Sequence, residues 1–175
     1  MKLRQVTFPA LGLLLLVGPH PATAGAAKKI LIHVKTALDK DDAQICVVPN
    51  IAWAALQAGN DVTLLFDGSA VTSVTKGWGW RGWFGAESTP MDRADLPERE
   101  RRALSEQLAY PLDKIPHDYG ECLRFLKDKG VRIYINKTMT VLYNIDADRI
   151  DPALTPVLLK DMVDLFQAAD RYLVY

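Results

Sequence analysis

Four polar residues each follow a short apolar run, at the position where a buried strand would end. They are Thr36, Asp67, Asn136 and Lys137. Because ligands of open α/β sheets lie outside the carboxyl ends of the strands, we expect these side chains to converge there. A carboxylate, an amide and a mobile cation can together hold a small polar or anionic ligand. The alternative is local: a turn at Asp67, a solvated Lys137 and an Asn136 side chain that bonds nearby backbone.

Two cysteines, Cys46 and Cys122, are the other reactive groups. Cys46 lies in the first turns of a predicted helix, where the helix dipole can lower the pKa of a thiol. Its neighbours Ile45 and Val48 favour a different role, that of a small buried hydrophobe. Cys122 lies on an apolar helix face, which is typical of a structural cysteine. Cys46 is therefore the alternative thiol for a sulfur-transfer or redox protein.

Other chemistry finds little support. His33 lies in the middle of an apolar strand, which is typical of a hydrogen-bonded core residue. No His, Cys or acidic residues have the spacing of metal ligands, so we expect no metal. The chain has neither a Gly-rich phosphate loop nor a nucleophilic serine motif, and no cofactor is expected. The residues thus favour binding over catalysis, without excluding an enzyme.

The hydrophobic pattern predicts the elements that position these residues. Strands are expected at 28–35, 61–66, 131–135 and 171–175, and helices at 43–58, 119–129 and 157–169. Continuous apolar runs indicate strands covered on both faces, as in a parallel sheet. We therefore predict an α/β fold in three layers, with 131–135 as the central strand. In this topology the helices that carry Cys46 and Cys122 lie on opposite faces of the sheet, too far apart for a disulfide.

The segment 77–118 interrupts this rhythm and is predicted to be an insertion. It contains three of the four tryptophans, Trp78, Trp80 and Trp83. A connection this long inside one domain is uncommon and is often a lid or a binding loop. The tryptophans are expected either to pack the insertion onto the domain or a subunit interface, or to cover a ligand. Packing is the favoured interpretation.

The first residues have the pattern of a signal peptide. A basic start, an apolar stretch with four consecutive leucines and a run of small residues predict a signal peptide at 1–26, removed after Ala24 or Ala26. Residues 27–175 are expected to form one domain that is periplasmic or secreted. The apolar stretch is too short for a lasting anchor, and no membrane span is expected after cleavage.

The charge of the chain argues against a nucleic-acid partner. The sequence contains 21 basic and 21 acidic residues. A near-neutral domain lacks the basic surface with which proteins attract phosphate backbones. The expected ligand is therefore a small molecule.

Three segments resemble the DsrE/DsrF-like sulfur-relay family. They are residues 28–71, which run from KKILIHVK to LLFDGSAV, residues 120–136, GECLRFLKDKGVRIYIN, and residues 168–175, AADRYLVY. The resemblance implies a flavodoxin-like three-layer sandwich with a mainly parallel sheet. It also implies a homo-oligomer, either a trimer or a hexamer. The predicted insertion lies outside the resemblance.

The resemblance places Asn136 at a functional position. In relay members of the family, a cysteine at the end of the third strand carries sulfur as a persulfide, and that position matches Asn136. An amide has no thiolate with which to attack a sulfur donor. We therefore predict an exported DsrE-like accessory or small-ligand-binding protein, linked to sulfur metabolism, whose ligand is held by Thr36, Asp67, Asn136 and Lys137. The alternative is a thiol-dependent protein that uses Cys46.

Overall fold

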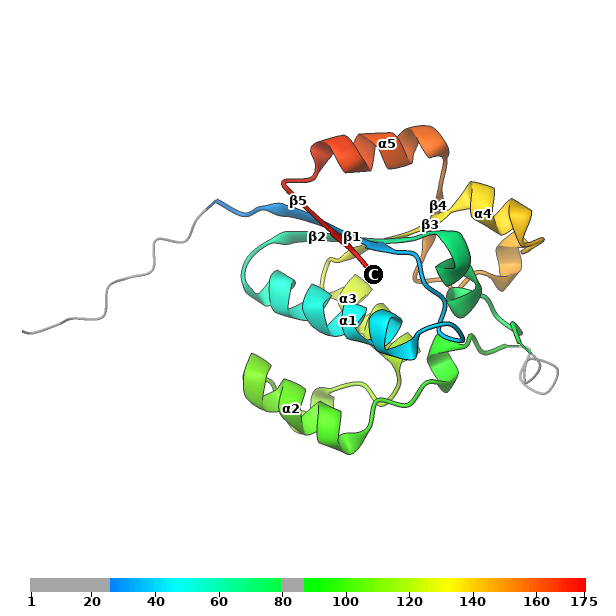
Figure 1. Cartoon of the computed structure of the whole chain (residues 1–175). Helices are drawn as coiled ribbons and strands as arrows, with labels where there is room; N and C mark the ends of the chain where they lie inside the picture. The colour runs from blue at the N-terminus through cyan, green and yellow to red at the C-terminus, as the bar shows by residue number, and fades with distance from the viewer. Residues whose placement is uncertain (1–25, 80–86) are drawn as a thin grey trace, which may run out of the picture.

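The computed structural model describes residues 26–79 and 87–175, which form a five-stranded sheet with helices on both faces (Figure 1). The strands are β1 (Lys29–Val34), β2 (Asp61–Phe66), β3 (Arg132–Asn136), β4 (Thr155–Val157) and β5 (Arg171–Val174). They lie in the order β4-β3-β2-β1-β5, and every neighbouring pair is parallel. All carboxyl ends therefore meet at one edge of the sheet.

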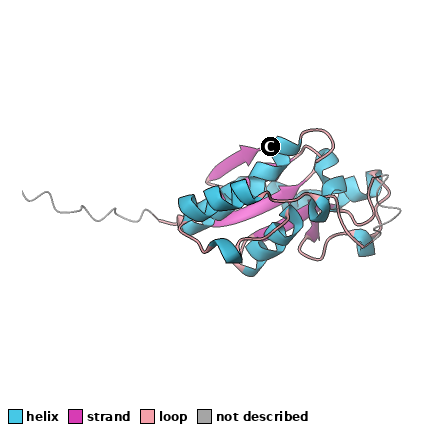
Figure 2. Cartoon of the chain, turned by 90° about the horizontal axis from the view of Figure 1, so that it is seen from below, coloured by secondary structure: helices cyan, strands magenta, loops and turns pink. Residues whose placement is uncertain are grey.

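Helices form the two outer layers. They are α1 (Asp42–Gln57), α2 (Glu98–Leu108), α3 (Tyr119–Asp128), α4 (Lys137–Leu142) and α5 (Leu159–Ala168), with 3-10 helices that include η1 (Gly68–Val74) and η3 (Met91–Arg93). Helices α1 and α3 lie against one face of the sheet, with α2 outside them, and Figure 2 shows this face. Helix α5 lies on the other face. The predicted three-layer α/β sandwich is confirmed.

Alternation along the strands explains why both faces are covered. Ile32 and Phe66 point toward α1 and α3 and belong to the larger core. Leu31 and Leu65, on the opposite face, pack with Met162 of α5 in a smaller core. Strands that are apolar on both faces bury most surface when helices cover each face, so these residues dictate a sandwich.

The strand order corrects two predictions. The middle strand is β2, while β3 lies between β2 and β4. The chain passes from β1 to β2 to β3 in one direction, and right-handed crossovers in one direction place their helices on the same face. Helices α1 and α3 are indeed in contact. The prediction that Cys46 and Cys122 lie on opposite faces is therefore wrong, although both are free thiols as expected.

Two elements were not predicted. Strand β4 is only three residues long and contains Pro156, so its sequence resembles a connector. Helix α4 begins directly after β3 with Lys137 and has six residues. The signal peptide predicted at 1–26 lies almost wholly outside the described residues, as do Trp80 and Trp83. No helix in 26–79 or 87–175 has the length and apolar character needed to cross a membrane.

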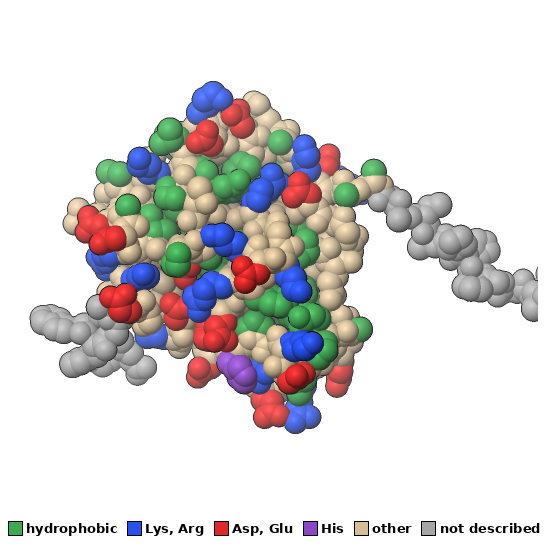
Figure 3. Space-filling model, turned by 180° about the vertical axis from the view of Figure 1, so that it is seen from behind, with side chains coloured by type: hydrophobic (Ala, Val, Ile, Leu, Met, Phe, Trp, Pro, Cys, Tyr) green, Lys and Arg blue, Asp and Glu red, His purple; other side chains and the backbone are tan. Residues whose placement is uncertain are grey.

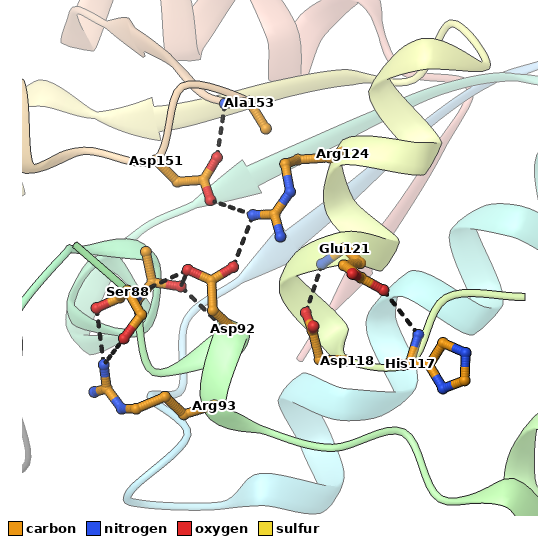
Figure 4. Close-up of polar contacts among 10 residues, drawn as sticks. Ser88, Asp92, Arg93, His117, Asp118, Glu121, Arg124, Asp151 and Ala153 are labelled. Carbon is orange, nitrogen blue, oxygen red and sulfur yellow. Dashed lines mark hydrogen bonds and ion pairs between the residues drawn. The ribbon is translucent and has the colours of Figure 1, made fainter. Parts of the chain in front are cut away.

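The insertion is attached to the rest of the domain by Arg124 of α3. Its Nη1 atom lies 2.7 Å from Asp92 Oδ1 and 3.1 Å from Asp151 Oδ2 (Figure 4). Asp92 also accepts hydrogen bonds from the backbone N–H and the hydroxyl of Thr89. The close approach of η3 to α3 requires Gly120, because a Cβ there would overlap the Asp92 carboxylate and lie 3.0 Å from its Cα.

Candidate functional site

A chain of hydrogen bonds crosses β5, β1, β2 and β3 near their carboxyl ends. The hydroxyl of Tyr172 lies 2.6 Å from His33 Nδ1, and His33 Nε2 lies 2.9 Å from Asp67 Oδ2. Asn136 Nδ2 donates to the other carboxylate oxygen, Asp67 Oδ1, at 2.7 Å. His33 and Asn136 are buried. We refer to Tyr172, His33, Asp67 and Asn136 as the strand-end chain.

The hydrogen bonds define the direction of the strand-end chain. A carboxylate can only accept, so His33 donates from Nε2 to Asp67. In the neutral imidazole Nδ1 then accepts from the hydroxyl of Tyr172. The bond from His33 is the largest cause that lowers the pKa of Asp67 to about 2, with further help from Asn136 and against partial burial. Burial and the charge of Asp67 raise the pKa of Tyr172, which therefore stays a hydroxyl.

Asn136 uses both its amide nitrogen and its amide oxygen in local hydrogen bonds. Its Oδ1 atom accepts from the backbone N–H of Thr138 at 2.8 Å and of Met139 at 3.4 Å, and thereby caps α4. Such a cap satisfies N–H groups that have no partner within the helix. Since Nδ2 donates to Asp67, one side chain joins β2 to the beginning of α4. The same position is only 3% exposed.

The other two predicted site residues lie apart from this chain. Thr36 follows β1 and its hydroxyl is 3.5 Å from Gln44 Oε1 of α1. Lys137 is exposed and is the first residue of α4. Within the described residues neither has a hydrogen bond to Asp67 or Asn136. The structure thus brings Asp67 and Asn136 into contact and places Lys137 next to Asn136 in sequence, with a cation free to meet solvent.

Two members of the strand-end chain were not among the predicted site residues. His33 was expected to be a hydrogen-bonded core residue, and its two ring nitrogens are both bonded. Tyr172 was assigned only to the last strand. The rings of Phe166 and Tyr172 lie 5.5 and 5.9 Å from the His33 ring and cover it from α5 and β5. The signal was the single histidine in an apolar strand, but its partner depends on β5 pairing with β1.

Neither Cys46 nor Cys122 is activated as a nucleophile. Burial raises the pKa of Cys46 to about 11, and a hydrogen bond with Tyr119 opposes this only in part. Burial also raises the pKa of Cys122 to about 12. The thiolate is the reactive form of cysteine, and these environments suppress it near neutral pH. No group of His, Cys, Asp and Glu in the described part of the chain has a geometry that could hold a metal ion.

A cavity of about 340 Å³ opens at the same edge of the sheet, on the side of α1. Its lining comes from the loop after β1, from η1 and from two stretches in the first half of the insertion: Leu38, Asp39, Thr72, Ser73, Trp78, Gly79, Pro90 and Arg93. Arg93 donates to the backbone oxygens of Ser88 and Trp78, which holds these two stretches together. The cavity therefore lies beside the predicted site and shares none of its four residues.

The comparisons with known proteins concern the fold. Neither a family model nor a curated protein matches the sequence. Among solved structures, the crystal structure of the ychN protein from E. coli is similar, with a TM-score of 0.54 and 14% sequence identity. The likeness covers 85% of this chain and 99% of that chain. This chain has the DsrE-like fold. At such low identity the likeness extends to the fold and no further.

The DsrE-like fold positions the strand-end chain at the carboxyl edge of the parallel sheet. The carboxyl edge of a parallel sheet is where α/β proteins position ligands and reacting groups. In this chain the edge carries a carboxylate, an imidazole and an amide that are fixed by one another. Such an arrangement presents an oriented polar surface and offers no thiol, since Cys46 and Cys122 lie on helices α1 and α3.

Proposed function

We propose that this protein is an exported DsrE-like accessory protein that binds a small polar or anionic ligand and does not carry sulfur on a thiol. One observation carries the proposal: at the end of β3 stands an amide, Asn136, whose donor and acceptor are both engaged by Asp67 and α4. An amide so fixed holds a site in shape and cannot form a persulfide. The link to sulfur metabolism rests on the DsrE-like fold.

Lys137 supplies the positive charge that attracts an anionic ligand. It is exposed, it belongs to the first turn of α4, and its ammonium group is free to turn toward an anion at the carboxyl edge. Asp67 repels an anion, so the ligand binds on the Lys137 side of Asn136 and meets Asp67 only through a donor group of its own. Thr36, across the edge after β1, offers a further hydroxyl.

Native mass spectrometry of protein purified from its host tests ligand binding directly. The mature protein is expected to retain a small molecule, and Lys137→Ala is expected to lose it. Lys160→Ala is the matched control, because Lys160 is an exposed lysine of α5 that pairs with Asp164. A wild-type protein without any bound mass, or equal retention in both variants, would contradict this site.

The thiol-dependent alternative has its own test. Wild type, Cys46→Ser and Asn136→Cys are incubated with a sulfane-sulfur donor and weighed intact. We expect one added sulfur only in Asn136→Cys, where a thiol would stand beside the first turn of α4. An adduct on wild type that disappears in Cys46→Ser would support a thiol relay through Cys46 in place of ligand binding.

Export is the next part of the proposal. It rests on the basic start, the apolar stretch and the small residues before Ala24 and Ala26. The mature protein is expected to begin after one of these two residues, in the periplasm or outside the cell. N-terminal sequencing of the exported protein that finds Met1 would contradict cleavage.

A homo-oligomer, a trimer or a hexamer, is the last part. The described residues expose nine large apolar side chains by more than a third, all on or beside α4, α5 and β5: Val141, Leu142, Leu158, Leu159, Val163, Phe166, Tyr172, Leu173 and Val174. The view in Figure 3 shows Lys and Arg side chains interspersed with Asp and Glu, with apolar side chains between them.

Exposed large apolar side chains are typical of an interface when they gather on one part of a surface, which is the reason to expect association. Light scattering at micromolar concentration measures the mass in solution. A value near that of one chain would count against association.

A further inference from the structure

The cavity of about 340 Å³ beside the carboxyl edge has an apolar wall. Leu38 contributes to it from the loop after β1, and Trp78 and Pro90 contribute from two stretches of the insertion. The indole ring of Trp78 is half-buried and meets the ring of Tyr143 edge to face, with 5.9 Å between the centroids, so it is held in place. Small-molecule sites have volumes of about 300–1,000 Å³ and are lined largely by such side chains. The cavity therefore has room for a compact ring.

Arg93 gives this cavity a positive charge. Its Nη1 atom donates to the backbone oxygen of Ser88 at 2.8 Å and to the Ser88 hydroxyl at 3.0 Å (Figure 4), and Nη2 donates to the Trp78 oxygen at 2.8 Å. A guanidinium has five N–H groups, so Nε and one hydrogen of Nη2 have no acceptor among the described residues. The adjacent carboxylate of Asp92 bonds Arg124 instead. In residues 26–79 and 87–175, no carboxylate forms an ion pair with Arg93.

Two buried hydroxyl groups line the same cavity. Ser73 is 1% exposed, and its Oγ atom accepts from the Leu38 N–H at 2.9 Å, while its own hydrogen has no acceptor within the described part of the chain. Thr72 is 5% exposed and donates to the Ser69 oxygen at 2.9 Å, which leaves its lone pairs available. Buried polar groups in folded proteins are usually satisfied by a partner. Ser73 can therefore donate, and Thr72 can accept, toward a molecule in the cavity.

Asp39 also lines the cavity and carries the opposite charge. Its side chain is 70% exposed and lies 3.7 Å from the Lys40 ammonium group. The field of such an exposed pair is weakened by water and salt. Arg93 is half-buried and has no counter-ion among the described residues, so the charge of Arg93 dominates inside the cavity. An anion is favoured over a cation.

We propose that this cavity is a second binding site, which takes a small aromatic carboxylate. The ring lies against Trp78 and Leu38, where aromatic packing stabilises it. The carboxylate accepts from the free N–H groups of Arg93 in charge-assisted hydrogen bonds, and the hydroxyl of Ser73 supplies a further donor. A simple anion such as sulfate would leave the apolar wall uncovered. A neutral ring would leave Arg93 without a counter-ion, so a ligand with both parts fits best.

Calorimetric titration of the mature protein with benzoate tests the proposal. One benzoate is expected to bind per chain. Benzyl alcohol has the same ring without the charge, and is expected to bind about tenfold more weakly or less, because hydrogen bonds to charged groups are the stronger ones. Inorganic sulfate, which has the charge without the ring, is expected to compete poorly. Equal affinity for benzoate and benzyl alcohol, or no binding of benzoate, would overturn the proposal.

Variants of the lining locate the site. Arg93→Gln removes the charge but keeps a side chain that can donate, and is expected to lose benzoate. Arg149→Gln is the matched control, because Arg149 is also half-buried and donates to a backbone oxygen, that of Lys76, at 2.9 and 3.1 Å. Leu38→Trp fills the cavity without changing any charge and is expected to abolish binding as well. Circular dichroism checks that each variant is folded. Binding that persists in either Arg93→Gln or Leu38→Trp contradicts this site.

The result separates from that of the site proposed at Asn136 and Lys137. Lys137 begins α4 and does not line the cavity, so Lys137→Ala is expected to bind benzoate as wild type does. Loss of benzoate in Lys137→Ala would assign this ligand to the carboxyl edge and overturn the cavity site. Conversely, a protein purified without any bound molecule would contradict the first site, while the affinity for added benzoate still decides the second.

Discussion

The Nε2 atom of His33 lies 2.9 Å from Oδ2 of Asp67, and the two residues come from neighbouring parallel strands. His33 also bonds Tyr172 of β5, and Asp67 also bonds Asn136 of β3. A single imidazole–carboxylate pair therefore connects four strands at the edge where the candidate site lies. Its energetics can be measured by separate substitutions along the chain.

Asp67→Asn is expected to reduce stability with a distinct pH profile. The pKa of Asp67 falls to about 2 in the folded protein, against roughly 3.9 for an unfolded aspartate. A group whose folded pKa is lowered stabilises the protein above the unfolded value, and this stabilisation is lost as the pH falls through the folded one. Urea unfolding should therefore show the gap between wild type and Asp67→Asn closing from about pH 4 to about pH 2. A gap that widens over this interval would contradict the assignment.

Asn136→Ala and Asn136→Asp should differ in their dependence on pH. Alanine removes the cap of α4 and one donor to Asp67, which costs about 1–3 kcal/mol. Aspartate keeps an oxygen for the cap but places a second carboxylate where Nδ2 lay 2.7 Å from Asp67. Repulsion raises one pKa of the pair, so this variant should lose about 3 kcal/mol or more at pH 7.

Protonation of the pair in Asn136→Asp then restores part of the loss. Because the raised folded pKa favours the protonated folded state, its stability relative to wild type should improve as the pH falls from 7 to 5. Denaturant unfolding of both variants at these two pH values measures the effect. Equal behaviour of Asn136→Ala and Asn136→Asp would show that Asn136 does not face a charged Asp67.

The sequence predicted which strands carry the residues of this site better than it predicted the contacts between those residues. Asp67 and Asn136 follow apolar runs that could only be strands, so their arrival at one edge was predictable from the strand pattern. Their direct contact was not, because it depends on β2 and β3 being neighbours. The sequence supports equally well an order with β3 on the far side of β1, and the observed pairing of β2 with β3 distinguishes the two.

The contact of Tyr172 with His33 was also not predictable, because it too depends on which strands are neighbours. Its strand was predicted, and His33 was recognised as a buried, bonded histidine. The pairing of β5 with β1 joins residues 139 positions apart, and local periodicity contains no information on that distance. The position of the cavity was not predicted for a related reason, since its lining includes two separate stretches of the insertion, which a hydrogen bond from Arg93 to Trp78 joins.

The tautomer of His33 gives a third expectation. Asp67 fixes the proton on Nε2, which leaves Nδ1 to accept from Tyr172. Nitrogen-15 chemical shifts of the imidazole should therefore show a protonated Nε2 at alkaline pH. Tyr172→Phe should move the Nδ1 resonance and cost about 0.5–1.5 kcal/mol for the lost hydrogen bond. A protonated Nδ1 in wild type would reverse the direction of the strand-end chain.

Gly120→Ala is expected to loosen the insertion. The new Cβ would overlap the Asp92 carboxylate and separate it from Arg124, and such overpacking costs about 1–3 kcal/mol. Thermal unfolding of Gly120→Ala, Asp92→Ala and the double variant measures the coupling between the two positions. If the clash is the cause, Gly120→Ala should cost less in the Asp92→Ala background. Additive losses would point to the helix backbone instead.

The pairing of the first strand with the last has a consequence for the order of assembly. Lys29 of β1 bonds Asp170 beside β5, a separation of 141 residues. During folding, strands β1 to β4 can pair before residues 171–174 do. Until β5 pairs with β1, one side of β1 is unpaired and His33 lacks its hydrogen bond with Tyr172. Contacts between distant segments form late because their loop closure is costly. An amide-exchange pulse during refolding should therefore find the amides of β5 protected last.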